Sequence, residues 1–124
     1  MIFLDTSLLI DSLTGHKLSG PSLMDAFNRG EAMLLSTITL CEWLRGPRTN
    51  AELTLQKNLF PSESIASFNA DEAAIAARLY RSVPRARGRE IDLMIAASAI
   101  RHDAELWTLN IADFKDIPGL RLLR

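Results

Sequence analysis

The chain has 124 residues, of which 48% are hydrophobic and 23% are charged, a composition typical of one soluble globular domain covering residues 1–124. Its formal net charge of −1 argues against a protein that binds nucleic acid through bulk positive charge. A single cysteine excludes an internal disulfide, and no apolar stretch approaches the ~20 residues that span a bilayer. We therefore expect a cytoplasmic protein with no membrane partner.

Apolar runs of strand length alternate along the chain with segments of helical periodicity. The expected strands are residues 1–4, 32–36, 64–68, 105–109 and 120–123. The expected helices are residues 6–13, 21–29, 38–44, 53–59, 70–83 and 90–100. This alternation predicts a single α/β domain, with a parallel central sheet of four to five strands and helices on both of its faces.

The first expected strand, residues 1–4, ends abruptly on a carboxylate, Asp5. Because a helix follows, Asp5 lies at the carboxyl edge of the sheet, where open α/β sheets bind their ligands. A second interpretation is that Asp5, Thr6 or Ser7 caps this helix, since short side-chain oxygens satisfy the free N–H groups at a helix start. These residues alone leave both interpretations open.

Two further carboxylates stand in apolar surroundings. Glu42 interrupts the helix expected at 38–44, and Asp92 interrupts the helix expected at 90–100. Charged side chains are almost never fully buried unless they are paired or bind a metal. Each acid also has an ordinary interpretation, because Glu42 could lie on an exposed helix stripe and the helix dipole favours Asp92 in a first turn.

Asp5, Glu42 and Asp92 together predict a metal site. Carboxylates held close together raise one another's pKa unless a cation neutralises them, and an oxygen-only donor set suits Mg²⁺ or Mn²⁺. One or two such ions activate a water and stabilise the leaving oxygen of a phosphodiester. The sequence has no His or Cys set for zinc and no Gly-rich phosphate loop, so these acids favour metal-assisted hydrolysis at a phosphate.

Five of the fourteen basic residues fall within twelve positions, at Arg78, Arg81, Arg85, Arg87 and Arg89. One interpretation is a solvated helix face followed by a polar loop. The other is a strip that binds phosphates, and on it we predict that Arg85, Arg87 and Arg89 contact the substrate.

Four segments in this order resemble the PIN-domain ribonucleases, and the length and motif order resemble the toxin subunits of VapBC toxin–antitoxin systems. The segments are Asp5-Thr6-Ser7, Glu42 in a helix after the second strand, residues 91–97 and residues 108–114. The resemblance covers nearly the whole chain, and it implies an Mg²⁺- or Mn²⁺-dependent endoribonuclease that hydrolyses RNA with a metal-activated water.

The resemblance also implies roles for individual residues. Asp5, Glu42 and Asp92 would bind the metal. A fourth polar catalytic position would follow the penultimate strand, where Asn110 and Asp113 both qualify. Thr6 and Thr108 would be hydroxyl donors near the substrate.

Partners follow from the same resemblance. A small cognate antitoxin would block the acidic site with an Arg or Lys side chain, and DNA would be contacted only through that antitoxin. The family further suggests a homodimer, in which the apolar helix faces of Leu9 and Leu13, or of Ile75 and Leu79, could pair. The alternative is a monomer whose helices pack only on its own sheet.

Other classes of protein remain open at this point. A receiver-type phosphoacceptor module also has acids at strand ends, but it requires a lysine just after a late strand, where this chain has Asn110. A haloacid-dehalogenase-type phosphatase requires a second aspartate where this chain has Ser7. A PIN-like module that binds RNA without cleaving it is compatible with all of these residues.

Overall fold

The fold alternates short strands with helices, and the computed structural model describes residues 1–15 and 18–123. The strands are β1 (Ile2–Leu4), β2 (Met33–Ser36), β3 (Ile65–Ala66), β4 (Glu105–Trp107) and β5 (Arg121–Leu122). The α-helices are α1 (Thr6–Leu13), α2 (Gly20–Asn28), α3 (Thr37–Arg45), α4 (Asn50–Leu59), α5 (Ala70–Ser82) and α6 (Glu90–Arg101), with short 3-10 helices η1 (Ser62–Ser64) and η2 (Ile111–Asp113). No helix within the described residues is both long enough and apolar enough to cross a membrane.

The strands form one parallel sheet in the order β3-β2-β1-β4-β5, which confirms the predicted α/β architecture. β1 is the central strand, and its register pairs Ile2 with Met33 of β2 and Leu4 with Trp107 of β4. The chain adds β2 and β3 on one side of β1 and then β4 and β5 on the other. The strand order therefore reverses between β1 and β4, and open α/β sheets bind ligands at such a reversal.

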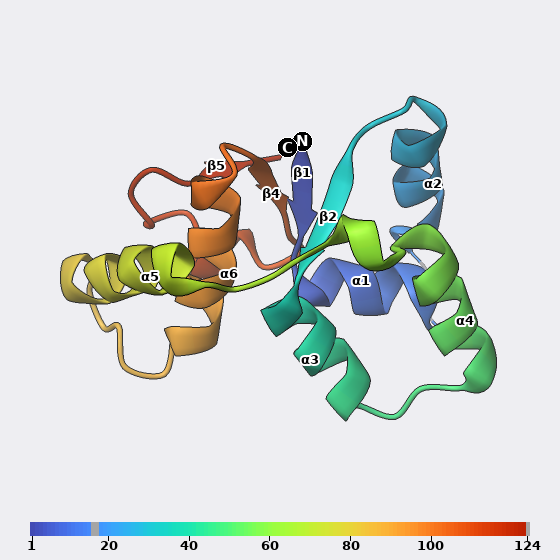
Figure 1. The fold of residues 1–124 in the computed structure, drawn as a ribbon, viewed down its shortest axis with the longest axis horizontal. Coiled ribbons are helices and arrows are strands. Elements are labelled where there is room, and N and C mark those ends of the chain that lie inside the picture. Colours follow the sequence, from blue (N-terminus) through green and yellow to red (C-terminus); the bar gives the residue numbers. More distant parts are fainter. Residues whose placement is uncertain (16–17, 124) are drawn as a thin grey trace.

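Helices cover both faces of the sheet (Figure 1), with α5 and α6 on one side and α1, α2 and α4 on the other. Successive residues of a strand point to opposite faces. Phe3 accordingly packs into the cluster that contains Leu93 of α6, whereas Leu4 packs into the cluster that contains Leu9 of α1. Because β1 is buried on both faces, its sequence is a continuous apolar run with no alternation.

The helix faces expected to form a homodimer are instead part of the chain's own core. Leu9, Leu13 and Leu79 are at most 2% exposed, and Ile75 packs partly buried against the α5–α6 cluster. An apolar stripe on a helix is satisfied by whatever sheet face it covers, and here that sheet belongs to the same chain. The expectation that Leu9, Leu13 and Leu79 pair with a second copy was wrong.

Candidate functional site

The carboxyl ends of β1 and β4 are neighbours at the centre of the sheet, and a buried polar residue follows each of them. Asp5 is 4% exposed, and its Oδ2 accepts hydrogen bonds from Thr108 Oγ1 at 2.7 Å and from Ser7 Oγ at 2.9 Å. Although Asp5 occupies the N-cap position of α1, its side chain makes no capping hydrogen bond. The Asp5 carboxylate therefore links the end of β1 to the end of β4 through Thr108, and it does not cap α1.

Backbone groups orient the two hydroxyls that hold Asp5. The N–H of Leu109 donates to Ser7 Oγ at 3.2 Å, and the N–H of Asn110 donates to Thr108 Oγ1 at 2.9 Å. A hydroxyl has one proton to donate, so each hydroxyl that accepts from the backbone directs its own proton to Asp5. Sequence reasoning missed the role of Ser7, for which the only signal was its place two residues after Asp5.

Glu42 comes from α3 and is held in the same manner. Its Oε1 accepts from Thr6 Oγ1 at 2.6 Å, and its Oε2 pairs with Arg45 Nη2 at 3.2 Å. The Glu42 side chain is 19% exposed, so it is neither buried in the core nor free on a surface stripe. The hydroxyls of Thr6 and Thr108, which we expected to face a substrate, donate to carboxylates in this structure.

Asp92 is the third residue of α6 and lies half-buried among other acids. Burial is the main cause that raises its pKa from 3.8 to about 6, followed by the negative charges of Asp5, Asp113 and Glu42, against a lowering by Arg89. Coulomb energies fall with distance. The contributions of three acids therefore indicate that Asp5, Asp113 and Glu42 each lie within electrostatic range of Asp92.

Two residues were expected at the fourth polar position, Asn110 and Asp113 of η2. The negative charge of Asp113 contributes to the raised pKa of Asp92. Asn110 is neutral and contributes its backbone N–H to Thr108, and both residues are exposed. We call Asp92 and the three acids whose charges act on it, Asp5, Glu42 and Asp113, the acid cluster.

The donor chemistry of the acid cluster fits a hard divalent cation. Within residues 1–15 and 18–123, no group of three or more His, Cys, Asp or Glu side chains is arranged so that it could hold a metal ion. Mg²⁺, however, keeps several waters and binds through one or two carboxylates. The cluster offers only oxygen donors, which such an ion prefers. A bound cation would also favour the ionised form of Asp92, whose pKa is raised by burial and by the neighbouring acids.

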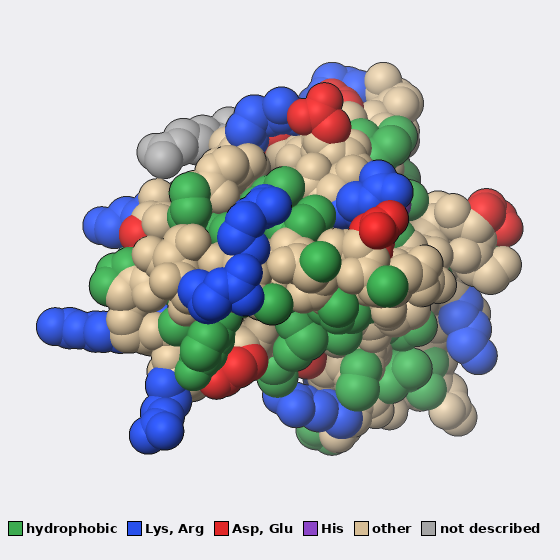
Figure 2. Space-filling view, turned by 60° about the vertical axis from the view of Figure 1, so that its left-hand side comes forward, with side chains coloured by type: hydrophobic (Ala, Val, Ile, Leu, Met, Phe, Trp, Pro, Cys, Tyr) green, Lys and Arg blue, Asp and Glu red, His purple; other side chains and the backbone are tan. Residues whose placement is uncertain are grey.

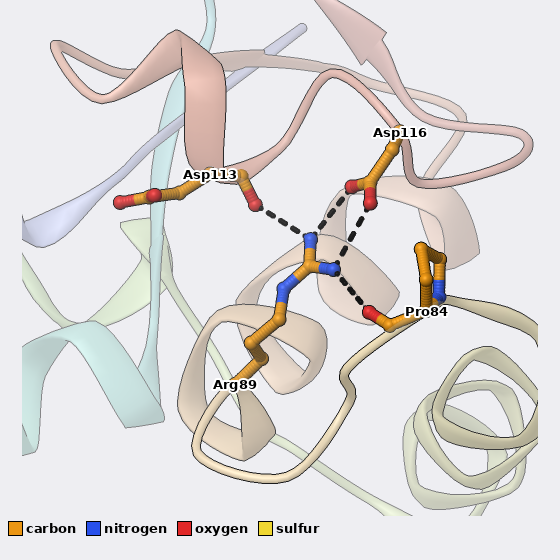
Figure 3. Close-up of polar contacts among 4 residues, drawn as sticks. All are labelled: Pro84, Arg89, Asp113 and Asp116. Atoms are coloured by element: carbon orange, nitrogen blue, oxygen red, sulfur yellow. Dashed lines mark hydrogen bonds and ion pairs between the residues drawn. The ribbon is translucent and has the colours of Figure 1, made fainter.

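The three arginines expected at the substrate do not share one environment. Arg85 and Arg87 are exposed between α5 and α6. The face that carries these two helices bears several Lys and Arg side chains with hydrophobic side chains between them (Figure 2). Arg89, which we expected to contact the substrate, binds within the protein to Asp116 and two backbone carbonyls (Figure 3).

Comparison with known proteins gives a consistent picture. A family model described as the PIN domain matches residues 2–120. The chain is 33% identical over 124 residues to a Mycobacterium tuberculosis protein named ribonuclease VapC19, with 98% of each chain covered. It is 34% identical over 135 residues to ribonuclease VapC1 of Rickettsia felis, covering 98% of this chain and 94% of that one. A crystal structure of Rickettsia felis VapBC2 bound to a promoter DNA fragment matches with a TM-score of 0.76 at 23% identity, covering 99% of this chain and 98% of that chain.

The raised pKa of Asp92 predicts the effect of removing its charge. The folded-state pKa of about 6 lies above the ordinary value of 3.8, so the stability associated with protonated Asp92 is full below pH 3.8 and is lost as the pH rises through 6. In EDTA at pH 7.5, Asp92→Asn is expected to raise the free energy of unfolding by about 1–2 kcal/mol, discounted for solvent screening.

Urea unfolding at pH 7.5 and pH 3.5 measures this effect. The gain should disappear at the lower pH, and Asp25→Asn on the exposed side of α2 removes the same charge outside the acid cluster as a control. A destabilised Asp92→Asn protein at pH 7.5 would contradict the electrostatic account of this site.

Proposed function

Because the chain belongs to the PIN-domain family, whose model matches residues 2–120, we propose that it is a divalent-metal-dependent endoribonuclease and the toxin of a toxin–antitoxin pair. The observation that carries the proposal is the acid cluster at the strand-order reversal of the sheet. The names of its curated relatives, which are ribonucleases, support RNA as the substrate. In this proposal residues 1–124 are one nuclease domain that acts in the cytoplasm.

Asp5, Glu42 and Asp92 are the residues that would hold Mg²⁺ or Mn²⁺, with Asp113 beside them. When bound, the ion supplies an activated water and neutralises charge at the scissile phosphodiester. Hydrolysis of that bond leaves a 5′-phosphate and a 3′-hydroxyl. A receiver-type module requires a lysine just after a late strand, and the segment 108–110 that follows β4 in this chain contains no lysine.

The hydroxyls of Thr6, Ser7 and Thr108 orient the carboxylates for this task. Thr108 and Ser7 both donate to Oδ2 of Asp5, which leaves Oδ1 as the oxygen that these hydroxyls do not engage. Thr6 fixes Oε1 of Glu42 in the same way. Such outer partners are worth about 10- to 100-fold in metal affinity or activity, because they hold ligands in position before the ion binds.

Loss of one cluster carboxylate tests the nuclease proposal. Incubated with a panel of structured RNAs, the wild type is expected to cleave with Mg²⁺ or Mn²⁺ and to stop cleaving in EDTA. Asp5→Asn is expected to lose more than the roughly 100-fold typical of an outer partner, whereas Asp25→Asn cleaves normally. Equal cleavage by Asp5→Asn would identify a contaminating nuclease, and binding without cleavage under every metal condition would identify an RNA-binding module.

Arg85 and Arg87 are proposed to contact phosphates of the bound RNA. For single-stranded RNA each lost phosphate contact lowers the slope of log affinity against log salt by about 0.7, so Arg85→Ala/Arg87→Ala is expected to lower it by about 1.4. The matched variant Arg29→Ala/Lys57→Ala removes the same charge beside α2 and in α4. The slopes are measured by fluorescence anisotropy. Equal salt slopes for the two double variants would show that Arg85 and Arg87 are solvated surface residues that do not contact phosphate.

A protein antitoxin and a homodimer complete the proposal. The VapBC2 structure from Rickettsia felis is a complex on promoter DNA, which supports an antitoxin as the partner that contacts DNA. We expect an arginine or lysine of that antitoxin to enter the acid cluster. Its positive charge would pair with the carboxylates and neutralise them. Two-fold homodimers are the commonest oligomers, although the faces first expected to pair are internal.

Co-purification from the native operon followed by mass measurement in solution tests both partners. We expect a complex that contains a small DNA-binding protein and two copies of this chain. A monomeric chain that purifies alone and is tolerated on overexpression would contradict the toxin assignment while leaving the nuclease chemistry intact.

A further inference from the structure

Arg89 makes an unusually complete set of hydrogen bonds for a side chain near the surface (Figure 3). Its Nη1 donates to Asp116 Oδ2 at 3.0 Å and to the carbonyl of Pro84 at 3.1 Å. Its Nη2 donates to Asp116 Oδ1 at 2.6 Å and to the carbonyl of Asp113 at 2.9 Å. The guanidinium thus forms a two-pronged pair with one carboxylate, the strongest arrangement available to such a group.

These contacts join three segments that are separate in sequence. Arg89 occupies the N-cap position of α6, three residues before Asp92, and Pro84 lies in the turn that follows α5. Asp113 and Asp116 belong to the segment that follows β4. One side chain therefore ties the start of α6, which carries one acid of the cluster, to η2, which carries another.

Hydrogen bonds from Leu109 and Asn110 hold the start of the segment 109–116, but few of its side chains are buried. Leu109 and Ile111 are 50% and 38% exposed, so this stretch does not pack deeply against the core. Phe114 is its buried anchor, at 1% exposed. The Arg89 contact fixes the backbone carbonyl of Asp113, while the side chain of Asp113 points away from Arg89 (Figure 3).

We propose that Arg89 is a positioning residue which, through the Asp113 carbonyl and the Asp116 carboxylate, holds the Asp113 side chain in the acid cluster. The inference rests on the proposed nuclease function only for its kinetic consequences. We call the contacts of Arg89 with Asp116 and with the Asp113 carbonyl the clamp. The charges of Asp113 and Arg89 both act on Asp92, as expected if the clamp and the acid cluster are adjacent. A role in binding RNA phosphate would require Arg89 to leave Asp116, with which its side chain pairs at only 19% exposure.

Loss of the clamp is expected to loosen η2 whether or not the protein is a nuclease. In hydrogen–deuterium exchange without metal, Arg89→Gln should speed exchange of the amides at the end of η2, which are those of Asp113, Phe114 and Lys115. These amides donate to the carbonyls of Asn110 and Ile111, and the β4 amides should be unchanged. The matched control is Arg121→Gln, because Arg121 also binds a carboxylate and a carbonyl, those of Asp103, at the opposite edge of the sheet. Unchanged exchange at η2 in Arg89→Gln would overturn the proposal.

Metal binding and turnover then separate positioning from other roles. We expect Arg89→Gln to lower Mn²⁺ affinity, measured by electron paramagnetic resonance, or kcat, by roughly 10- to 100-fold, with the KM for RNA and the salt slope unchanged. Arg89→Lys keeps the charge but cannot form the fork, so it should behave like Arg89→Gln. Rescue by lysine, or a change confined to KM and salt slope, would identify a phosphate contact and overturn the proposal.

Breaking the clamp from its other side gives a second test. Asp116→Asn should reproduce the effect of Arg89→Gln, and the double variant should be no worse than either single variant, because both remove one interaction. Additive losses would overturn the proposal. If the wild type cleaves no RNA, the nuclease function fails, while exchange and Mn²⁺ binding still decide the role of Arg89.

Discussion

The burial of Asp92 beside three other acids is the constraint on which this site depends. The acids come from the end of β1, from α3, from the first turn of α6 and from η2. Burial, followed by the negative charges of the other three acids, raises the pKa of Asp92. A parallel sheet makes this convergence possible, because the carboxyl ends of all its strands lie at one edge. β1 is central, so the segments that follow its neighbours surround Asp5.

Neutral and charged groups support the acids in different ways. Hydroxyls of Thr6, Ser7 and Thr108 donate directly to carboxylate oxygens, which orients the oxygens without cancelling their charge. Arg89 pairs with Asp116 and reaches Asp113 through the backbone carbonyl, and its charge opposes the rise in the pKa of Asp92. Arg45 pairs with Oε2 of Glu42. Asp5 is held by hydroxyls alone, so its orientation is set without a neighbouring cation.

Neighbouring arginines show how far the environment can differ within a short stretch. Arg85 has a positive φ of 54° in the turn after α5 and is exposed, whereas Arg89 stands at the start of α6 and faces the segment after β4. Both were grouped by charge in the sequence. Charge alone describes attraction to phosphate, whereas the guanidinium of Arg89 is engaged within the protein by an acid 27 residues away in sequence.

The sequence by itself determined which segments become strands and helices and which acids stand at their ends. Local periodicity encodes secondary structure and buried faces, so the apolar run before Asp5 and the acids within α3 and α6 were visible without coordinates. Tertiary structure alone decided that Asp5 is held by Thr108 across 103 positions, that Asp113 is coupled to Asp92, and that Arg89 pairs with Asp116. It also decided that Leu9 and Leu13 face the chain's own sheet. The physical reason is that such partners are set by how complete elements pack in space, and linear spacing carries no information about contacts between segments far apart in the chain.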